Sequence, residues 1–258
     1  MSPTTVRDQL SLRLEPDLPN LPNLPATLRP MLPRLGAEPF DSAAHLFEPS
    51  WGGRRALAFV GPAEVPGGGD VRLVDGEGRD LAPALPELAG LAVRIDARSA
   101  ILDGELVVVD AGGRADEAEL ERRLGGGRGR PVAYLAFDLL HLDGRSLLSA
   151  ALFRRRDQLR RVLRAGDEVV AVPAIAAEGR ALHEAVAAQG IAGVMARQRT
   201  SPYLSGVRSR LWRFIAADPS AAGAERDGAP ADDAPADHAP ASAPVVALIR
   251  RLPLLFDE

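Results

Sequence analysis

The stretch "FEPSWGGRRALAFV", residues 47–60, decides how this chain is organised. Apolar residues stand on both sides of a glycine pair, and this pattern predicts a strand, a tight turn and a second strand. Between the strands we expect an exposed loop that carries Ser50 and Trp51. The strongest nucleophile of the loop is a serine hydroxyl, which is un-ionised at neutral pH and needs an adjacent base. The stretch therefore has the layout of an active-site loop without an obvious catalytic group.

The rest of the body alternates apolar strand patterns with amphipathic helical patterns, and "GEG" (76–78) and "AGG" (111–113) read as glycine turns. Hairpins mixed with helices favour α+β layers over a parallel βαβ fold. Further strands are expected at 45–49, 55–60, 70–75, 99–110, 131–143, 168–175, 192–198 and 211–217. Helices are expected at 83–93, 116–124, 150–163 and 179–188.

Composition excludes several kinds of chemistry. The chain of 258 residues is 46% hydrophobic, which is typical of a globular protein, and it contains no cysteine. Disulfides, thiolate catalysis and cysteine-ligated zinc are therefore excluded, and the four scattered histidines have no metal-ligand spacing. All 31 basic residues are arginine. Any reaction that needs a lysine amine is excluded, because arginine stays protonated and cannot replace it as a nucleophile.

Changes in composition divide the chain into four segments. Residues 1–30 are proline-rich, 31–216 form the folded domain, 217–244 read as a disordered Ala/Pro/Asp linker, and 245–258 ("VVALIRRLPLLFDE") are an apolar tail. The tail is either a docking motif for a partner or a segment that folds back. No apolar run is long enough to span a membrane and no signal sequence is present, so we expect a cytoplasmic protein, with nucleoid association left open.

Charge gives weak support for nucleic-acid binding. The folded domain is nearly neutral, whereas nucleic acid attracts clustered positive charge. One basic cluster exists, "FRRRDQLRRVLR" (153–164). Its ordinary interpretation is a solvated helix face with arginine–carboxylate pairs, and its functional one is a docking surface.

The order of motifs resembles a known family. "LDGELVVVD" (102–110), "AFDLLHLDG" (136–144) and "SPYLSGVRSRLW" (201–212) follow the opening stretch in the order and spacing of the adenylation domain of ATP-dependent DNA ligases. The chain looks most similar to the ligase module of bacterial non-homologous end-joining enzymes, over about residues 30–216. The resemblance implies a ligase-type nucleotidyltransferase fold, ATP-grasp-like, with antiparallel sheets flanked by helices. No OB-fold is expected, because the 42 residues after Ala216 are too few for one.

The resemblance also implies a chemistry and a set of site residues. In the family a lysine amine attacks the α-phosphorus of ATP, AMP is passed to a DNA 5′-phosphate, and Mg²⁺ offsets the phosphate charge. The resemblance places Glu48, Arg55, Glu105, Phe137 and Arg197 at the family's nucleotide-binding positions. Glu105 matches a ribose- or metal-facing carboxylate, and Phe137 stands where the family stacks an aromatic ring on the nucleotide.

Several catalytic positions depart from the family pattern. The family's first motif is Glu-x-Lys-x-Asp-Gly-x-Arg, and residues 48–55 stand at its positions. Ser50 replaces the lysine and Gly52 replaces the aspartate. The other substituted positions are Gly76 for an arginine, Ala192 for a metal-binding glutamate, Arg197 for a lysine, and Phe214 and Ala216 for two phosphate-binding lysines. His45 is five residues from Ser50, about 16 Å along a strand, too far to act as its base.

Together these features predict an ATP-dependent DNA ligase-like protein of DNA repair and recombination that is a pseudoenzyme, unable to self-adenylate. The alternative is a non-catalytic scaffold that docks a repair partner through its arginine-rich helix or through residues 245–258. ATP, Mg²⁺ and DNA are implied by the resemblance, and non-covalent ATP binding stays open.

Overall fold

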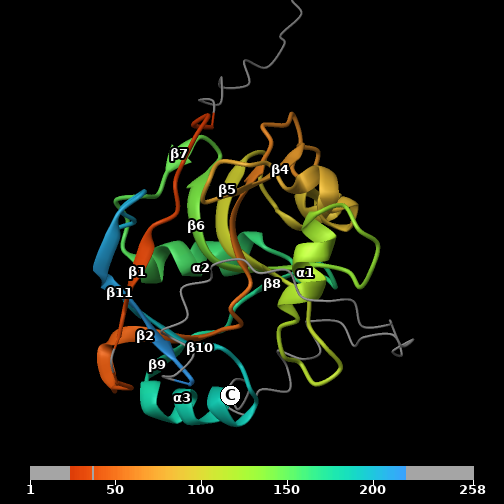
Figure 1. The fold of residues 1–258 in the computed structure, drawn as a ribbon. Coiled ribbons are helices and arrows are strands. Elements are labelled where there is room, and N and C mark those ends of the chain that lie inside the picture. The colour runs from red at the N-terminus through yellow and green to blue at the C-terminus, as the bar shows by residue number, and fades with distance from the viewer. Residues whose placement is uncertain (1–23, 37, 219–258) are drawn as a thin grey trace, which may run out of the picture.

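Two sheets with flanking helices make up the part of the chain that the computed structural model describes, residues 24–36 and 38–218 (Figure 1). Most strand pairs are antiparallel, and β1–β11 and β6–β8 are parallel. The α+β prediction is therefore confirmed. The six-stranded sheet has the order β4–β3–β5–β6–β7, with β8 beside β6, and the five-stranded sheet has the order β1–β11–β10–β2–β9. The strands are β1 Leu32–Leu35, β2 Ser42–Ser50, β3 Arg54–Val60, β4 Val71–Asp75, β5 Ala100–Val107, β6 Ala133–Leu142, β7 Arg145–Ser146, β8 Val169–Ala171, β9 Ile175–Ala177, β10 Gly193–Gln198 and β11 Arg208–Ala216. The helices are η1 Ala82–Ala84, η2 Pro86–Arg94, α1 Glu117–Leu124, α2 Leu152–Val162 and α3 Gly179–Ala188.

The six-stranded sheet is buried on both faces. Along β3, Leu57 and Phe59 belong to a core shared with the five-stranded sheet, whereas Ala56, Ala58 and Val60 face a second core under η2, α1 and α2. Successive side chains of a strand point to opposite faces. Covering both faces explains why β3, β5 and β6 read as nearly continuous apolar runs.

The five-stranded sheet packs against α3, which lies beneath it in Figure 1. Leu182 and Val186 of this helix join the shared core. The helix begins at Gly179, where a Cβ atom would lie 2.4 Å from the Phe47 ring and 2.2 Å from a backbone oxygen. Only glycine permits this close approach, so the sequence fixes where α3 meets β2.

The opening stretch crosses from one sheet to the other. Its two predicted strands exist, but β2 pairs with β10 and β9, and β3 pairs with β4 and β5. The loop between them was expected to expose Trp51. The structure corrects this, because Trp51 is buried and its indole N–H donates to the Gly113 carbonyl at 3.3 Å. The apolar ring covers the junction of the two sheets.

Two other elements differ from the sequence predictions. The helix expected at 83–93 is formed by the 3₁₀ segments η1 and η2, since Pro86 lacks the N–H that a continuous α-helix would use. The strand expected at 168–175 is two strands in different sheets, β8 and β9, with Pro173 between them. Both predicted glycine turns are present, with positive φ at Gly78 and Gly113.

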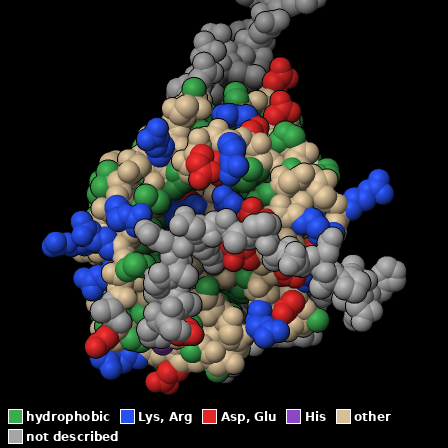
Figure 2. Space-filling model, viewed as in Figure 1, with side chains coloured by type: hydrophobic (Ala, Val, Ile, Leu, Met, Phe, Trp, Pro, Cys, Tyr) green, Lys and Arg blue, Asp and Glu red, His purple; other side chains and the backbone are tan. Residues whose placement is uncertain are grey.

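Several expectations lie outside the described residues. They concern most of the proline-rich segment, almost all of the linker, and the apolar tail, so the limits 31 and 216 stay predictions. Leu24 and Leu28 do pack against the shared core. None of the helices within 24–36 and 38–218 is long and apolar enough to cross a membrane. On the face shown in Figure 2, arginine and acidic side chains are intermixed.

Candidate nucleotide site

The six residues singled out at the family's nucleotide site line one cavity between the two sheets. They come from β2, β3, β5, β6 and β10, and the cavity has a volume of about 170 Å³. The strands on either side of the opening stretch bring them together, because β2 places its residues in one sheet and β3 in the other. The six residues are Glu48, Ser50, Arg55, Glu105, Phe137 and Arg197.

Glu48 is buried between two arginines. Its exposed fraction is 1%, its Oε1 accepts from Arg156 Nη1 at 2.6 Å, and its Oε2 is paired with Arg197 Nη1. Burial lowers the pKa of Arg197 to about 9 and that of Arg156 to about 10, so both groups are still protonated at neutral pH. One carboxylate thus compensates two enclosed cations, and a buried charge without such a partner is costly.

The basic cluster of α2 supplies Arg156, which the sequence analysis did not place in the site. Arg155 and Arg156 are both buried, and Arg155 forms a bidentate pair with Asp138 at 2.8 Å. The solvated-face interpretation is therefore wrong for these two residues. A signal was available, because Leu152, Arg155, Arg156 and Leu159 follow the i, i+3, i+4, i+7 spacing of one helix face.

The guanidinium groups of two arginines already lie against the ring of Phe137, the residue expected to stack on the nucleotide. The central carbon of Arg197 lies 4.0 Å from the ring centroid, and that of Arg55 lies 4.6 Å from it. Arg197 is also 4.7 Å from the Trp212 ring. Such cation–π contacts are favourable in a dehydrated setting. The aromatic surface that a base would use is therefore shared with the protein's own side chains.

Arg55 is fixed by Asp103, a fully buried carboxylate on β5. The guanidinium donates two hydrogen bonds of 2.5 Å to the two Asp103 oxygens, and Tyr203 donates to the same carboxylate at 2.6 Å. Burial alone would lower the pKa of Arg55, but the charge and hydrogen bonds of Asp103 outweigh it and raise that pKa above its ordinary value. Arg55 is thus held in place by Asp103.

Glu105, the candidate ribose- or metal-facing residue, is turned onto the crossing loop. Its Oε1 accepts the backbone N–H of Gly53. Burial raises the pKa of this carboxyl, against the opposing effects of that hydrogen bond and of Arg55. A Cβ atom at Gly53 would lie 2.1 Å from the Leu106 carbonyl oxygen, so glycine is required for the loop to approach β5 this closely.

Ser50 lines the cavity without an activating base. Among the described residues, no carboxylate or imidazole hydrogen-bonds its hydroxyl. His45 lies five positions earlier on β2 and its Nδ1 is 3.0 Å from Ser42 Oγ. At Gly52, where the family has an aspartate, φ is +80° and a Cβ atom would lie 3.0 Å from Ala192 Cβ. A side chain there would be both strained and crowded.

The arrangement does not fit ATP with Mg²⁺. Small-molecule pockets usually measure about 300–1,000 Å³, whereas this cavity measures about 170 Å³. Phe214 lines the cavity where the family presents a lysine to the phosphates. In residues 24–36 and 38–218, no group of three or more His, Asp or Glu side chains is placed to hold a metal ion.

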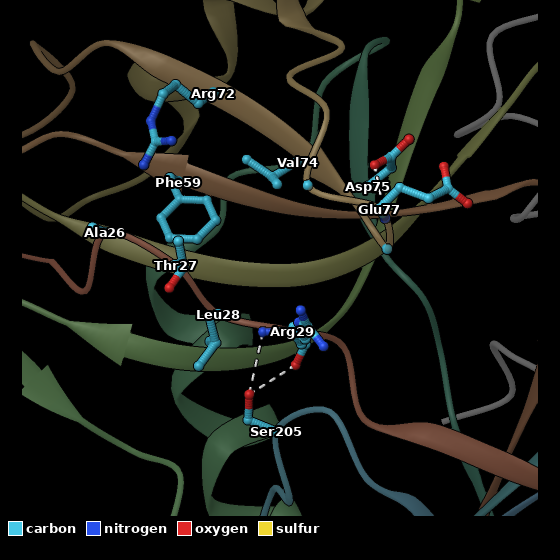
Figure 3. A pocket seen from close by; sticks show the side chains of 12 residues that line it. Ala26, Thr27, Leu28, Arg29, Phe59, Arg72, Val74, Asp75, Glu77 and Ser205 are labelled. Atoms are coloured by element: carbon cyan, nitrogen blue, oxygen red, sulfur yellow. Dashed lines mark hydrogen bonds between the residues drawn. The ribbon is translucent and has the colours of Figure 1, made fainter.

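A larger cavity of about 600 Å³ lies away from these six residues, between residues 26–29 and the β3–β4 hairpin (Figure 3). Arg72 lies over the Phe59 ring at 4.7 Å, and the Arg29 backbone exchanges hydrogen bonds with Ser205. Asp75 at the far end accepts from Arg79. This cavity could not be predicted from the sequence, because the placement of residues 26–29 is not encoded in a local pattern.

Comparison with known proteins supports the family resemblance. The family described as "ATP dependent DNA ligase domain" matches residues 37–214. The chain is 32% identical over 166 residues to the multifunctional non-homologous end joining DNA repair protein LigD of Mycobacterium tuberculosis, covering 64% of this chain and 21% of that protein. It is 35% identical over 153 residues to a probable DNA ligase of Rhodococcus opacus, covering 57% and 30%. The chain thus spans less than a third of either relative.

Solved structures give the same result. A mycobacterial DNA ligase D complexed with ATP and MES matches with a TM-score of 0.62 at 30% identity, over 73% of this chain and 60% of that chain. The ligase domain of M. tuberculosis LigD matches with a TM-score of 0.59 at 30% identity, over 72% and 58%. Both matches therefore cover more than two thirds of this chain.

Proposed function

The chain belongs to the ATP-dependent DNA ligase family, and we propose that it is a pseudoenzyme of that family, one that neither self-adenylates nor seals DNA. One observation carries the proposal. Each retained residue of the nucleotide site is paired within the protein: Glu48 with two arginines, Glu105 with a loop N–H, and Arg55 with Asp103. Residues that would hold a ligand in a working ligase here hold the fold.

The missing nucleophile supports the same proposal. Covalent adenylation needs an amine that is free to attack phosphorus. No lysine occurs anywhere in the sequence, and the arginines at the cavity remain protonated at neutral pH. Ser50 has neither a hydrogen-bonded base nor the neighbouring aspartate that the family supplies. A lysyl phosphoamide intermediate is therefore excluded, and among the described residues no group is hydrogen-bonded to Ser50 to accept the proton of its hydroxyl.

The lack of room for a nucleotide extends the proposal to ATP binding. A purine would have to displace the guanidinium of Arg197 from Phe137, and Arg197 is at the same time bound to Glu48. Breaking a buried charge pair by moving one partner costs about 3–5 kcal/mol. The contacts of Arg197 with Glu48 and Phe137 therefore compete with a nucleotide for this cavity.

Mass spectrometry of the full chain with ATP and Mg²⁺ tests the proposal. We expect no bound nucleotide under native conditions, and no AMP adduct after denaturation of the same sample. An adduct that survives denaturation would disprove the loss of catalysis. A complex that is lost on denaturation would overturn the occluded cavity but leave the loss of catalysis standing. A ligase that contains the family lysine, treated in parallel, shows that an adduct can be detected.

A second candidate function is that of a scaffold in the cytoplasm that docks DNA or a repair partner. The observation that favours it is the exposed basic side of α2, where Arg154, Arg160 and Arg161 surround the half-exposed Phe153. DNA binding through phosphates would weaken steeply with salt. Salt-dependent binding of a DNA end would favour DNA as the partner. Loss of a protein partner on deletion of residues 245–258 would favour docking through the tail instead.

A further inference from the structure

A basic groove lies along α2, and Arg156, which pairs with Glu48 of the nucleotide site, is one of its lining residues. The groove, which we call the α2 groove, has a volume of about 360 Å³ and is lined by Arg154, Arg160, Arg161 and Arg199. Arg160 and Arg161 share one carboxylate, that of Asp157, at 3.6 and 2.6 Å. Within the described residues, no carboxylate lies within ion-pair distance of Arg154 or Arg199. The groove therefore keeps an excess of positive charge.

Apolar surface accompanies this charge. Phe153 is 40% exposed, and Leu46 and Ala174 line the same groove. A ligand that matches both features would carry several carboxylates spaced by small apolar residues. Such a ligand would meet arginines without having to bury an unpaired charge.

A segment of this same chain has that chemistry, and we propose that it occupies the α2 groove. Residues 225–237, "ERDGAPADDAPAD", hold five acidic residues and one arginine, and alanine and proline make up most of the remainder. The segment lies outside the described residues. Its acidic residues are Glu225, Asp227, Asp232, Asp233 and Asp237.

The length of chain beyond the last described residue fits this placement. Ala216 pairs with Gly193 at the start of β10, and Arg199 follows the end of that strand, about 20 Å away at ~3.3 Å per residue. Asp232 is 14 residues further along the chain than Asp218, and an unconstrained chain of that length has a root-mean-square span of about 20 Å. A tether whose span matches the separation gives the highest effective concentration.

Docking of this segment would neutralise much of the positive charge of the α2 groove. Five carboxylates next to the groove would compete with any other polyanion, nucleic acid included, for the same arginines. A partner would then have to displace the segment.

The lack of cysteine makes the contact directly measurable in the full chain. Ala234→Cys is combined with Gln158→Cys in the groove, and separately with Ala187→Cys on α3 as the matched control. The control is demanding because α3 touches Ala216 through His183 at 2.9 Å and is therefore near the tether. The rate of intramolecular disulfide formation is followed in dilute protein. Three exposed ion pairs together favour the docked state by about tenfold, so the groove pair should cross-link about tenfold faster.

Two treatments, added salt and removal of the segment's acidic charges, test whether the contact is electrostatic. The difference should vanish in about 0.5 M NaCl, where charges are screened beyond ~5 Å, and also when Asp232, Asp233 and Asp237 are all changed to Asn. Equal rates for the two pairs, or a difference that resists both treatments, would overturn the proposal. If Gln158→Cys lowers the unfolding midpoint, Arg161→Cys at the exposed rim of the groove replaces it.

Discussion

Glu48→Gln should destabilise the protein severely, although the same position in a working nucleotide site would mainly affect the ligand. The substitution keeps size and hydrogen-bonding shape but removes the only carboxylate that pairs with Arg156 and Arg197 among the described residues. Both arginine side chains are at most 4% exposed. Removing one partner of a buried ion pair costs about 3–5 kcal/mol, because the remaining charge is left uncompensated. Here two charges are left, so we expect at least the upper part of that range.

Arg197→Met is the matched comparison, since it leaves Glu48 in a one-to-one pair with Arg156. Its cost should be the smaller of the two, because no buried charge is stranded. Urea unfolding followed by the fluorescence of Trp51 and Trp212 measures both variants. A loss of 3–5 kcal/mol corresponds to about 6–20 °C in Tm for a domain of this size. If the free energy of unfolding of Glu48→Gln lies within about 1 kcal/mol of the wild-type value, the inference that Glu48 stabilises the fold is refuted.

Two further predictions concern the crossing loop. The pKa of Glu105 is raised in the folded protein above its unfolded value. The stabilising contribution of the protonated carboxyl is therefore fully present below about pH 4.5. It is lost as the pH rises through the folded pKa. Glu105→Gln should therefore gain stability relative to the wild type as the pH rises above about 4.5, and urea titrations showing a pH-independent difference would contradict this. Ser50→Lys with Gly52→Asp should not give a robust ligase, since position 52 has φ +80° and its Cβ would lie 3.0 Å from Ala192; efficient sealing of a nicked duplex by the double variant would disprove that expectation.

Most of the fold could be predicted because local patterns determine it. The apolar runs of β3, β5 and β6 are long, and α2 and α3 have clear helical periodicity. Errors arose where proline changed the local geometry, as between β8 and β9. They also arose where a strand was very short, as in β1 and β7, because four or fewer residues carry too little pattern.

The site was predicted only as a set of positions. The resemblance to a family pointed to the residues that the structure later placed around one cavity, but not to their partners. Glu48 and Arg156 are 108 residues apart, and no periodicity links residues at that distance. Arg156 itself was visible on the buried face of α2, where its spacing from Leu152 and Leu159 marked it as internal.

The sequence by itself determined which chemistry is absent. A chain without lysine or cysteine cannot form a lysyl phosphoamide or a thiolate, whatever its fold, because side-chain functional groups are set by composition. Only the tertiary structure decided what the retained charged residues do. In the dehydrated space between two sheets each charge must find a partner, and the nearest ones to Glu48, Asp103 and Glu105 are the protein's own arginines and backbone amides.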